Sequence, residues 1–296
     1  MKVAIIVDST SYLSPTLATK PNIFQVNLSV NFADGTTYQD ASNPEIISEF
    51  YKRLKSEKQL PTTSQPQVGE YYQIMENLVA QHYEAVISIH LASAISGTFQ
   101  QAQMVLKEFE DRIQTYCIDS KGSSVVLESL VSQTHDLLSK GYSPEVIVEG
   151  LLLAVEEAQI YLMVEDLNNL SKGGRLSSTS AFFGNVLQIK PLLYFDQEGK
   201  IVLFEKIRST KKVYQRWEAL IMAYNEAHPK GFVLAFAHAQ AEEQVMQVLN
   251  KTKSKLGPEV SFLVGSIGPV IGTHIGAGAR GMALIPRLET LITPEN

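Results

Sequence analysis

Cysteine is nearly absent from this sequence, in which Cys117 is the only one among 296 residues. One thiol excludes a disulfide within the chain and a zinc site built from several cysteines. The six histidines are scattered, and no two of them stand at the His-x-x-x-His spacing typical of a metal site. We therefore expect neither a metal ion nor a cofactor.

Long apolar runs and an excess of positive charge are missing too. No run approaches the roughly 20 apolar residues that cross a bilayer, and the apolar run at residues 3–7 is too short for a secretion signal. The 25 basic residues are outnumbered by 31 acidic ones, which gives a net charge of -6. Because binding to nucleic-acid phosphates needs a basic surface, we expect no nucleic-acid partner. These absences predict a cytoplasmic protein with no stable membrane insertion.

The sequence does contain an alternation of short apolar runs with helical patterns. The apolar runs are rich in β-branched residues, which favours strands, and the alternation favours a parallel sheet covered by helices. The segment Asp196-Gln197-Glu198-Gly199 separates two such runs and predicts a hairpin turn, so part of the protein should be antiparallel. The predicted strands are residues 3–7, 24–30, 85–90, 113–118, 160–164, 191–195, 201–207, 232–237, 261–264 and 281–285.

The hairpin indicates a second region of different build. Asn43-Pro44 and Ser143-Pro144 each place a capping side chain before a proline, which predicts helices that begin at these points. The second of these helices should end near residue 158, where we place a domain boundary. The predicted fold class is therefore α/β with two α/β domains, residues 1–158 with a largely parallel sheet and residues 159–296 with a mixed sheet.

Five polar or glycine-containing segments follow the predicted strands. In open α/β sheets ligands gather at the carboxyl ends of the strands, so segments far apart in sequence can meet in one crevice. Each segment taken alone is explained as well by a capped turn. The five are residues 8–10 (DST), 62–66 (TTSQP), 93–98 (SAISGT), 171–175 (SKGGR) and 272–276 (GTHIG).

Ser96-Gly97-Thr98 predicts an anion site. It opens a helical pattern, and free N–H groups at a helix start beside two hydroxyls can bind an anion. The sequence has neither the P-loop nor the Gly-x-Gly-x-x-Gly pattern of nucleotide sites. A carboxylate or a single phosphate is therefore the expected ligand.

Three other segments have both a structural and a functional interpretation. Thr63 or Ser64 could simply cap the helical pattern that follows Pro66. His274 lies in a predicted loop among several glycines, where the backbone can approach a ligand closely, but a single histidine is as often structural. The two cations of residues 172–175 could be solvated charges of a turn or a docking point for a phosphorylated partner.

Taken together and in order, these segments resemble the DegV family. The resemblance runs over nearly the whole chain, and six separate pieces in the same order make it specific. The pieces are residues 3–10 (VAIIVDST), 62–66 (TTSQP), 93–98 (SAISGT), 169–177 (NLSKGGRLS), 189–193 (IKPLL) and 268–279 (GPVIGTHIGAGA).

The resemblance implies a lipid-binding protein without catalytic turnover, in which two α/β domains hold a long-chain fatty acid such as palmitate between and within them. The family's carboxylate-binding residues match Thr63, Ser96 and His274. Ala277 stands where the family commonly has proline after His-x-Gly, which is expected to loosen the loop around His274. The positions expected to support the site are Ser64, Gly97, Thr98 and Gly276.

The resemblance also implies a partner, because in many bacteria the family serves a fatty acid kinase that phosphorylates the bound carboxyl group for phospholipid synthesis. Arg175, with Lys172, matches the basic element implicated in docking that kinase. Two alternatives stay open. One is a serine-dependent acyl hydrolase with Ser96 as nucleophile and His274 as base, although Ser96 lacks the Gly-x-Ser-x-Gly setting. The other is a lipid-sensing regulatory protein, which would need the same pocket.

Overall fold

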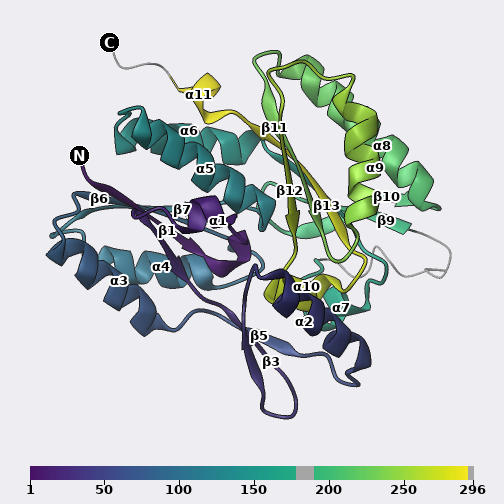
Figure 1. Ribbon diagram of the computed structural model, residues 1–296, viewed down its shortest axis with the longest axis horizontal. Helices are drawn as coiled ribbons and strands as arrows, with labels where there is room; N and C mark the ends of the chain where they lie inside the picture. The colour runs from purple at the N-terminus through teal and green to yellow at the C-terminus, as the bar shows by residue number, and fades with distance from the viewer. Residues whose placement is uncertain (178–189, 293–296) are drawn as a thin grey trace.

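The computed structural model describes residues 1–177 and 190–292, which form two large sheets, one small sheet and the helices around them (Figure 1). Ile189, the first residue of one DegV-like segment, lies outside the described residues. The first elements are β1 (Val3–Asp8), η1 (Ser9–Ser11), α1 (Pro15–Ala18), β2 (Ile23–Val26), β3 (Ser29–Asn31), β4 (Thr37–Gln39), α2 (Pro44–Ser56), β5 (Thr62–Ser64), α3 (Val68–Ala80), β6 (Ala85–His90), α4 (Thr98–Lys107), β7 (Gln114–Asp119), α5 (Val125–Ser139) and α6 (Pro144–Glu157). The later elements are β8 (Gln159–Met163), α7 (Asn168–Lys172), β9 (Lys190–Phe195), β10 (Ile201–Ile207), α8 (Thr210–Ala227), β11 (Phe232–His238), α9 (Glu242–Lys253), β12 (Ser261–Ser266), α10 (Pro269–Ile275), β13 (Arg280–Pro286) and α11 (Leu288–Leu291).

The first large sheet, here called the parallel sheet, has the strand order β2-β1-β6-β7, and every neighbouring pair in it is parallel. All residues of β1 and β6 are buried, as expected for central strands that are covered by helices on both faces. Successive side chains enter different cores: Ala4 and Ile6 pack toward α3 and α4, whereas Ile5 and Val7 pack on the side of α5. The prediction of a largely parallel first sheet is confirmed.

The second large sheet, here called the mixed sheet, has the order β10-β9-β8-β13-β11-β12. Only β11 and β12 are parallel, and the other neighbours are antiparallel. The predicted hairpin joins β9 to β10, and the amide of Gly199 donates to the carbonyl of Asp196 at 2.9 Å. The predicted mixed build of the second sheet, and with it the α/β fold class, is confirmed.

Helices α5 and α6 fill the space between the two large sheets. On one side α5 contacts β1 and β6, and on the other side it contacts β11, β12 and β13. Helices α3 and α4 cover the far face of the parallel sheet, and α8 and α9 cover the far face of the mixed sheet (Figure 1). The order of layers is therefore helix, sheet, helix, sheet, helix, and one buried apolar cluster runs through the middle layer.

The segment between β1 and β6 departs from the prediction. The predicted strand at residues 24–30 is two strands, β2 and β3, which belong to different sheets. The chain turns between them because the amide of Asn27 donates to Glu70 and the amide of Leu28 donates to Ser9 Oγ, in place of strand partners. β3 then pairs with β4 and β5 in a three-stranded sheet that was not predicted, since strands of three residues show too little alternation.

Both predicted helix starts are observed, and Asn43 Oδ1 accepts hydrogen bonds from the amides of Glu45 and Ile46 at 2.8 and 3.2 Å. Helix α6 ends at Glu157, next to the domain boundary placed near residue 158, which stays a prediction. Among the described residues, no helix is long and apolar enough to cross a bilayer.

Candidate functional site

A cavity of about 370 Å³ lies between the beginning of α5 and the inner face of the mixed sheet. Small-molecule sites typically measure roughly 300–1,000 Å³. Val125 and Val126 form the α5 wall, and Ala237 of β11 and Gly281 of β13 line the sheet wall. Because these strand residues are small, the sheet surface leaves room beside the helix, and most of the space is bounded by apolar side chains.

Four of the five polar segments predicted to converge meet at this cavity. Thr63, Ser96, Arg175 and His274 each come from a different segment, and all four line it. The supporting residues Ser64 and Gly97 line it as well. The fifth segment, residues 8–10, lies elsewhere. The structure thus brings together residues that are more than two hundred positions apart, as the rule for the carboxyl ends of strands anticipates.

Thr63 and His274 form the central polar contact of the site. Thr63 Oγ1 and His274 Nε2 are 2.9 Å apart. Nδ1 of His274 is buried and has no hydrogen-bond partner among the described residues. A proton on Nε2 would be donated to Thr63 Oγ1, which leaves the hydroxyl hydrogen of Thr63 free to be donated to a ligand oxygen. This pair can therefore act as a relay of hydrogen-bond donors toward a carboxylate.

His274 is uncharged near neutral pH. Burial, and then the positive charge of Arg175, lower the pKa of the His274 imidazole to about 4. The segment that carries Arg175 can approach His274 because Gly173 has no side chain: a Cβ on Gly173 would lie 2.6 Å from His274 Nδ1. The positive charge at this end of the cavity consequently belongs to the Arg175 guanidinium, and His274 contributes hydrogen bonding.

Ser96 lies just before α4 and forms hydrogen bonds with the first residue of that helix. Its Oγ is 2.8 Å from Thr98 Oγ1 and accepts a hydrogen bond from the amide of Thr98 at 3.3 Å. Gly97 stands at the N-cap, where an added Cβ would lie 2.4 Å from the side-chain nitrogen of Gln65. The first amides of a helix lack acceptors within the helix, so this corner offers donors to an anion beside the Ser96 hydroxyl.

Two interpretations of local structure were wrong. Thr63 and Ser64 lie in β5 and do not cap α3, whose N-cap is Gln67, and Ser64 Oγ instead accepts a hydrogen bond from Asn31 at 2.8 Å. Thr63 contacts His274, whereas Ser64, which also lines the cavity, is exposed.

His274 was predicted in a loop but lies on helix α10. The glycines before it serve packing against protein rather than approach to a ligand. A Cβ on Gly268 would lie 2.3 Å from the ring of Tyr12, and a Cβ on Gly272 would lie 2.5 Å from the hydroxyl of Tyr51. Helix α10 can therefore pack closely against Tyr12 and Tyr51, and this packing fixes the position of His274. Gly276 ends this helix in the left-handed region, at a φ of 73°.

Arg175 and Lys172 occupy different places. Arg175 is half-buried, lines the cavity, and donates hydrogen bonds to the carbonyl oxygens of Ile95 and Gly173. Lys172, the last residue of α7, is exposed and does not line the cavity. The apolar walls were not predicted, because residues such as Ile160 and Phe195 look like ordinary core in the sequence.

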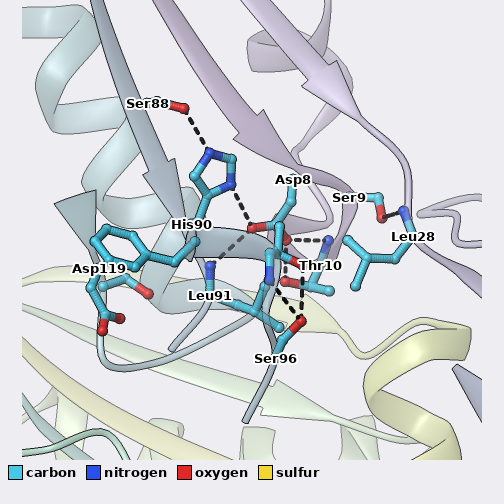
Figure 2. Close-up of polar contacts among 12 residues, drawn as sticks. Asp8, Ser9, Thr10, Leu28, Ser88, His90, Leu91, Ser96 and Asp119 are labelled. Atoms are coloured by element: carbon cyan, nitrogen blue, oxygen red, sulfur yellow. Dashed lines mark hydrogen bonds and ion pairs between the residues drawn. The ribbon is translucent and has the colours of Figure 1, made fainter. Parts of the chain in front are cut away.

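A separate cluster has the composition of a hydrolytic triad but is sealed (Figure 2). His90 Nε2 is 2.6 Å from Ser88 Oγ, and His90 Nδ1 is 3.2 Å from Asp8 Oδ2. All three residues have no exposed surface, and none lines the cavity. In the part of the chain that the structure describes, no group of three His, Cys, Asp or Glu side chains could hold a metal ion.

The sequence and the fold both match known proteins. The family model for "Uncharacterised protein, DegV family" matches residues 2–287. Protein DegV of Bacillus subtilis (strain 168) is 38% identical to this chain over 285 residues, which cover 95% of this chain and 98% of that protein.

Two solved structures of proteins described as fatty acid binding are similar to this chain. The DegV family protein SAG1342 from Streptococcus agalactiae aligns with a TM-score of 0.87 and 32% identity, over 97% of this chain and 99% of that one. DegV from Bacillus subtilis aligns with a TM-score of 0.83 and 37% identity, over 96% of this chain and 99% of that one. The matches extend over almost all of each protein, and the resemblance found in the sequence is confirmed: this chain belongs to the DegV family.

Proposed function

We propose that this chain binds one long-chain fatty acid, with the acyl chain in the cavity and the carboxylate at Thr63, Ser96 and His274. The observation that carries the proposal is the junction of an apolar cavity with a cluster of hydrogen-bond donors that includes the guanidinium of Arg175. Family members of similar sequence are described as fatty acid binding, which supports the assignment.

The acyl chain supplies most of the affinity. A palmitate tail buries about 15 carbons, and at roughly 0.8 kcal/mol per methylene its transfer from water is worth on the order of 12 kcal/mol before ordering costs. Val125, Ile160 and Phe195 are among the apolar side chains that would replace water around the tail. The tail therefore decides whether a ligand binds.

The polar end orients the ligand and compensates the carboxylate. A buried carboxylate without partners would lose several kcal/mol of hydration. The Thr63 hydroxyl, the Ser96 corner and the Arg175 charge supply donors within one region of the cavity wall. Because these groups lie where the cavity meets the surface, the carboxyl group would be within reach of a second protein.

We further propose that the carboxyl group is presented to a separate fatty acid kinase, and that this chain itself performs no turnover. Lys172 and Arg175 lie on the surface side of the carboxylate site, where acidic groups or phosphates of a partner could bind them. Phosphoryl transfer would belong to the partner. Among the described residues, the site contains hydrogen-bond donors and cations, and no carboxylate is hydrogen-bonded to His274.

The first experiment tests for the lipid. Protein purified after bacterial expression is extracted with organic solvent, and the extract is analysed by mass spectrometry for stoichiometric saturated or monounsaturated fatty acid. The delipidated protein is then titrated with palmitate and oleate, and with hexadecanol, which has the tail without the acid, as a control. Absence of fatty acid in the extract together with no binding of added palmitate would contradict the proposal.

A second experiment tests the presentation to a kinase. Arg175→Ala is measured for palmitate affinity and for acyl phosphate formation with a bacterial fatty acid kinase and ATP. We expect phosphorylation to fall more than affinity, since Arg175 also borders the surface pocket. Arg175→Lys is the matched control, because it keeps the charge but loses the planar fork of the guanidinium. Unchanged phosphorylation in Arg175→Ala would remove Arg175 from the docking role.

The hydrolase alternative would require Ser96 to be activated by His274. His274 Nε2 instead pairs with Thr63, and Ser96 Oγ pairs with Thr98. Assays with p-nitrophenyl acyl esters separate the two proposals, because a binding protein shows no serine-dependent turnover. A lipid-sensing role remains compatible with the same pocket, and the kinase assay distinguishes it.

A further inference from the structure

A buried serine in the cavity wall is not used by the proposed carboxylate site. Ser124 lines the cavity at the N-cap of α5 and is only 4% exposed. Its Oγ is buried and has no hydrogen-bond partner among the described residues. A buried hydroxyl without a partner is unfavourable, because it has lost its hydration and gained nothing in return. A ligand in the cavity is therefore the partner available to Ser124.

The backbone holds Ser124 in an uncommon conformation. Its φ of 56° and ψ of -126° lie in a region that residues other than glycine rarely adopt. The amide of Ser124 donates to the carbonyl of Thr10 in η1 at 2.9 Å, and its own carbonyl accepts from the amide of Glu128 at 3.1 Å. These two bonds tie the residue to η1 and to the first turn of α5, so the hydroxyl keeps its place in the cavity wall.

The beginning of α5 adds to the donor character of this part of the wall. Ser123 also lines the cavity, and its carbonyl accepts from the amide of Val126 at 3.2 Å. Helix α5 has 15 residues, and the start of such a helix combines amides without intrahelical acceptors with a partial positive charge. The described wall of the cavity contains no Asp or Glu. An acceptor oxygen on a ligand suits this place.

We propose that Ser124 and the start of α5 bind an oxygen atom carried by the acyl chain itself, as in an oxo or hydroxy fatty acid. This binding mode rests on the proposed function, which places the acyl chain in the cavity, and it adds a class of substrate. A plain alkyl chain offers no acceptor, so it would cover the Ser124 hydroxyl and leave it unpaired. A chain oxygen at the right carbon would accept the hydroxyl hydrogen, whereas the same oxygen at other carbons would lie against apolar side chains.

Ser124 also has the setting of a hydrolase nucleophile, since it lies in a strained turn between strand β7 and helix α5. Among the described residues, however, no His, Asp or Glu is hydrogen-bonded to its hydroxyl. Without a base to remove its proton, the hydroxyl is not activated for attack. It remains a hydrogen-bond donor, which is the form that binds an acceptor oxygen.

Ketone oxygens placed along the acyl chain test this assignment. Palmitate and a series of oxo-hexadecanoic acids, in which the ketone moves along the chain from one acid to the next, compete with a fluorescent fatty acid for the delipidated full chain. We expect one oxo acid to bind about tenfold more tightly than the others, because only there can Ser124 donate to the oxygen. Ser124→Ala should remove this preference. Ser124→Gly should do the same and also relieves the backbone conformation, so it replaces the alanine variant if that variant does not fold.

Ser129→Ala provides the matched control, because Ser129 is a buried serine of the same helix that does not line the cavity. It should keep the preferred ketone position of the parent. Similar affinities of the parent for all oxo acids would overturn the inference, as would a preferred position that survives in both Ser124 variants. Equal weakening of palmitate and of the preferred oxo acid would also overturn it, since the hydroxyl would then serve the fold or the carboxylate. Failure of the parent to bind palmitate would instead contradict the proposed function.

Discussion

Two hydroxyl–histidine pairs in this molecule have similar geometry and opposite surroundings. Ser88 and His90 are 2.6 Å apart, and Asp8 contacts the other nitrogen of the ring (Figure 2). Thr63 and His274 are 2.9 Å apart, and the other nitrogen of that ring has no partner among the described residues. The first pair is completely buried, whereas the second lines a cavity.

The composition of a side-chain cluster alone therefore does not identify a functional site. The Asp8 cluster has the residues of a catalytic triad but no access for a substrate, so its hydrogen bonds stabilise the fold. Asp8 also accepts hydrogen bonds from the amides of Thr10 and Leu91, which join β1 to the end of β6. The Thr63–His274 pair is accessible to a ligand, but among the described residues no carboxylate is hydrogen-bonded to His274 Nδ1. This arrangement suits binding without proton abstraction.

Asp40 connects the two regions. Its buried carboxylate accepts hydrogen bonds from Ser9 Oγ at 3.1 Å and from the amide of Val270 at 3.0 Å. Ser9 follows Asp8, and Val270 belongs to α10, the helix that carries His274. A change at Asp40 can therefore affect both the buried cluster and the ligand site, and four predictions separate these contributions.

Asp8→Ala should have the largest effect on stability. It leaves His90 and the amides of Thr10 and Leu91 without their common acceptor in a fully buried place. We expect the free energy of unfolding to fall by roughly 3–5 kcal/mol, measured by urea denaturation. Palmitate affinity of the protein that remains folded should be unchanged. A loss of affinity at full stability would place Asp8 in the ligand site.

Asp40→Asn should change the pH dependence of stability. Burial raises the pKa of the Asp40 carboxyl to about 7, although hydrogen bonds from Val270 and Ser9 lower it. The folded protein thus binds this proton more tightly than the unfolded chain, so stability is lost as the pH rises from about 4 to about 7. Over that window the loss is on the order of 4 kcal/mol. Urea denaturation across the window should show that, as the pH rises, the parent loses stability relative to Asp40→Asn by on the order of 4 kcal/mol.

His274→Gln should also change the pH dependence of stability, in the opposite direction to Asp40→Asn and by a slightly smaller amount. Burial and Arg175 lower the pKa of His274 to about 4, so the unfolded chain binds this proton more tightly between about 4 and 6.5. The stability contributed by neutral His274 is present above that window and is lost as the pH falls, by on the order of 3 kcal/mol. Parent stability should therefore change little over the shared window, because the two contributions oppose each other. Identical pH profiles of the parent and His274→Gln would contradict the lowered pKa.

The sequence predicts the large sheets better than the site. Long apolar runs such as β1 and β6 are legible because their burial is continuous, whereas β4 and β5 are too short to show alternation. The convergence of Thr63, Ser96 and His274 followed from a topological rule and from the family resemblance. The cavity itself could not be predicted, since Ala237 and Gly281 acquire meaning only when α5 is placed opposite them.

The smallest and most specific effect is expected when the hydroxyls of Thr63 and Ser88 are removed in two separate variants. Thr63→Val keeps the shape of the side chain but removes its hydroxyl, so palmitate affinity should fall about tenfold, equivalent to about 1.4 kcal/mol, with little change in stability. Ser88→Ala removes the matching hydroxyl from the sealed pair and leaves His90 Nε2 unpaired in the core. It should lower the free energy of unfolding by about 1–3 kcal/mol and leave palmitate affinity unchanged.

The two variants are compared by urea denaturation and by palmitate titration of the same preparations. Loss of affinity in Ser88→Ala at unchanged stability, or loss of stability without loss of affinity in Thr63→Val, would reverse the assignment of the two pairs. The expected result is a separation of the two measurements: because one hydroxyl meets a cavity and the other meets only protein, the first contributes to binding and the second to folding.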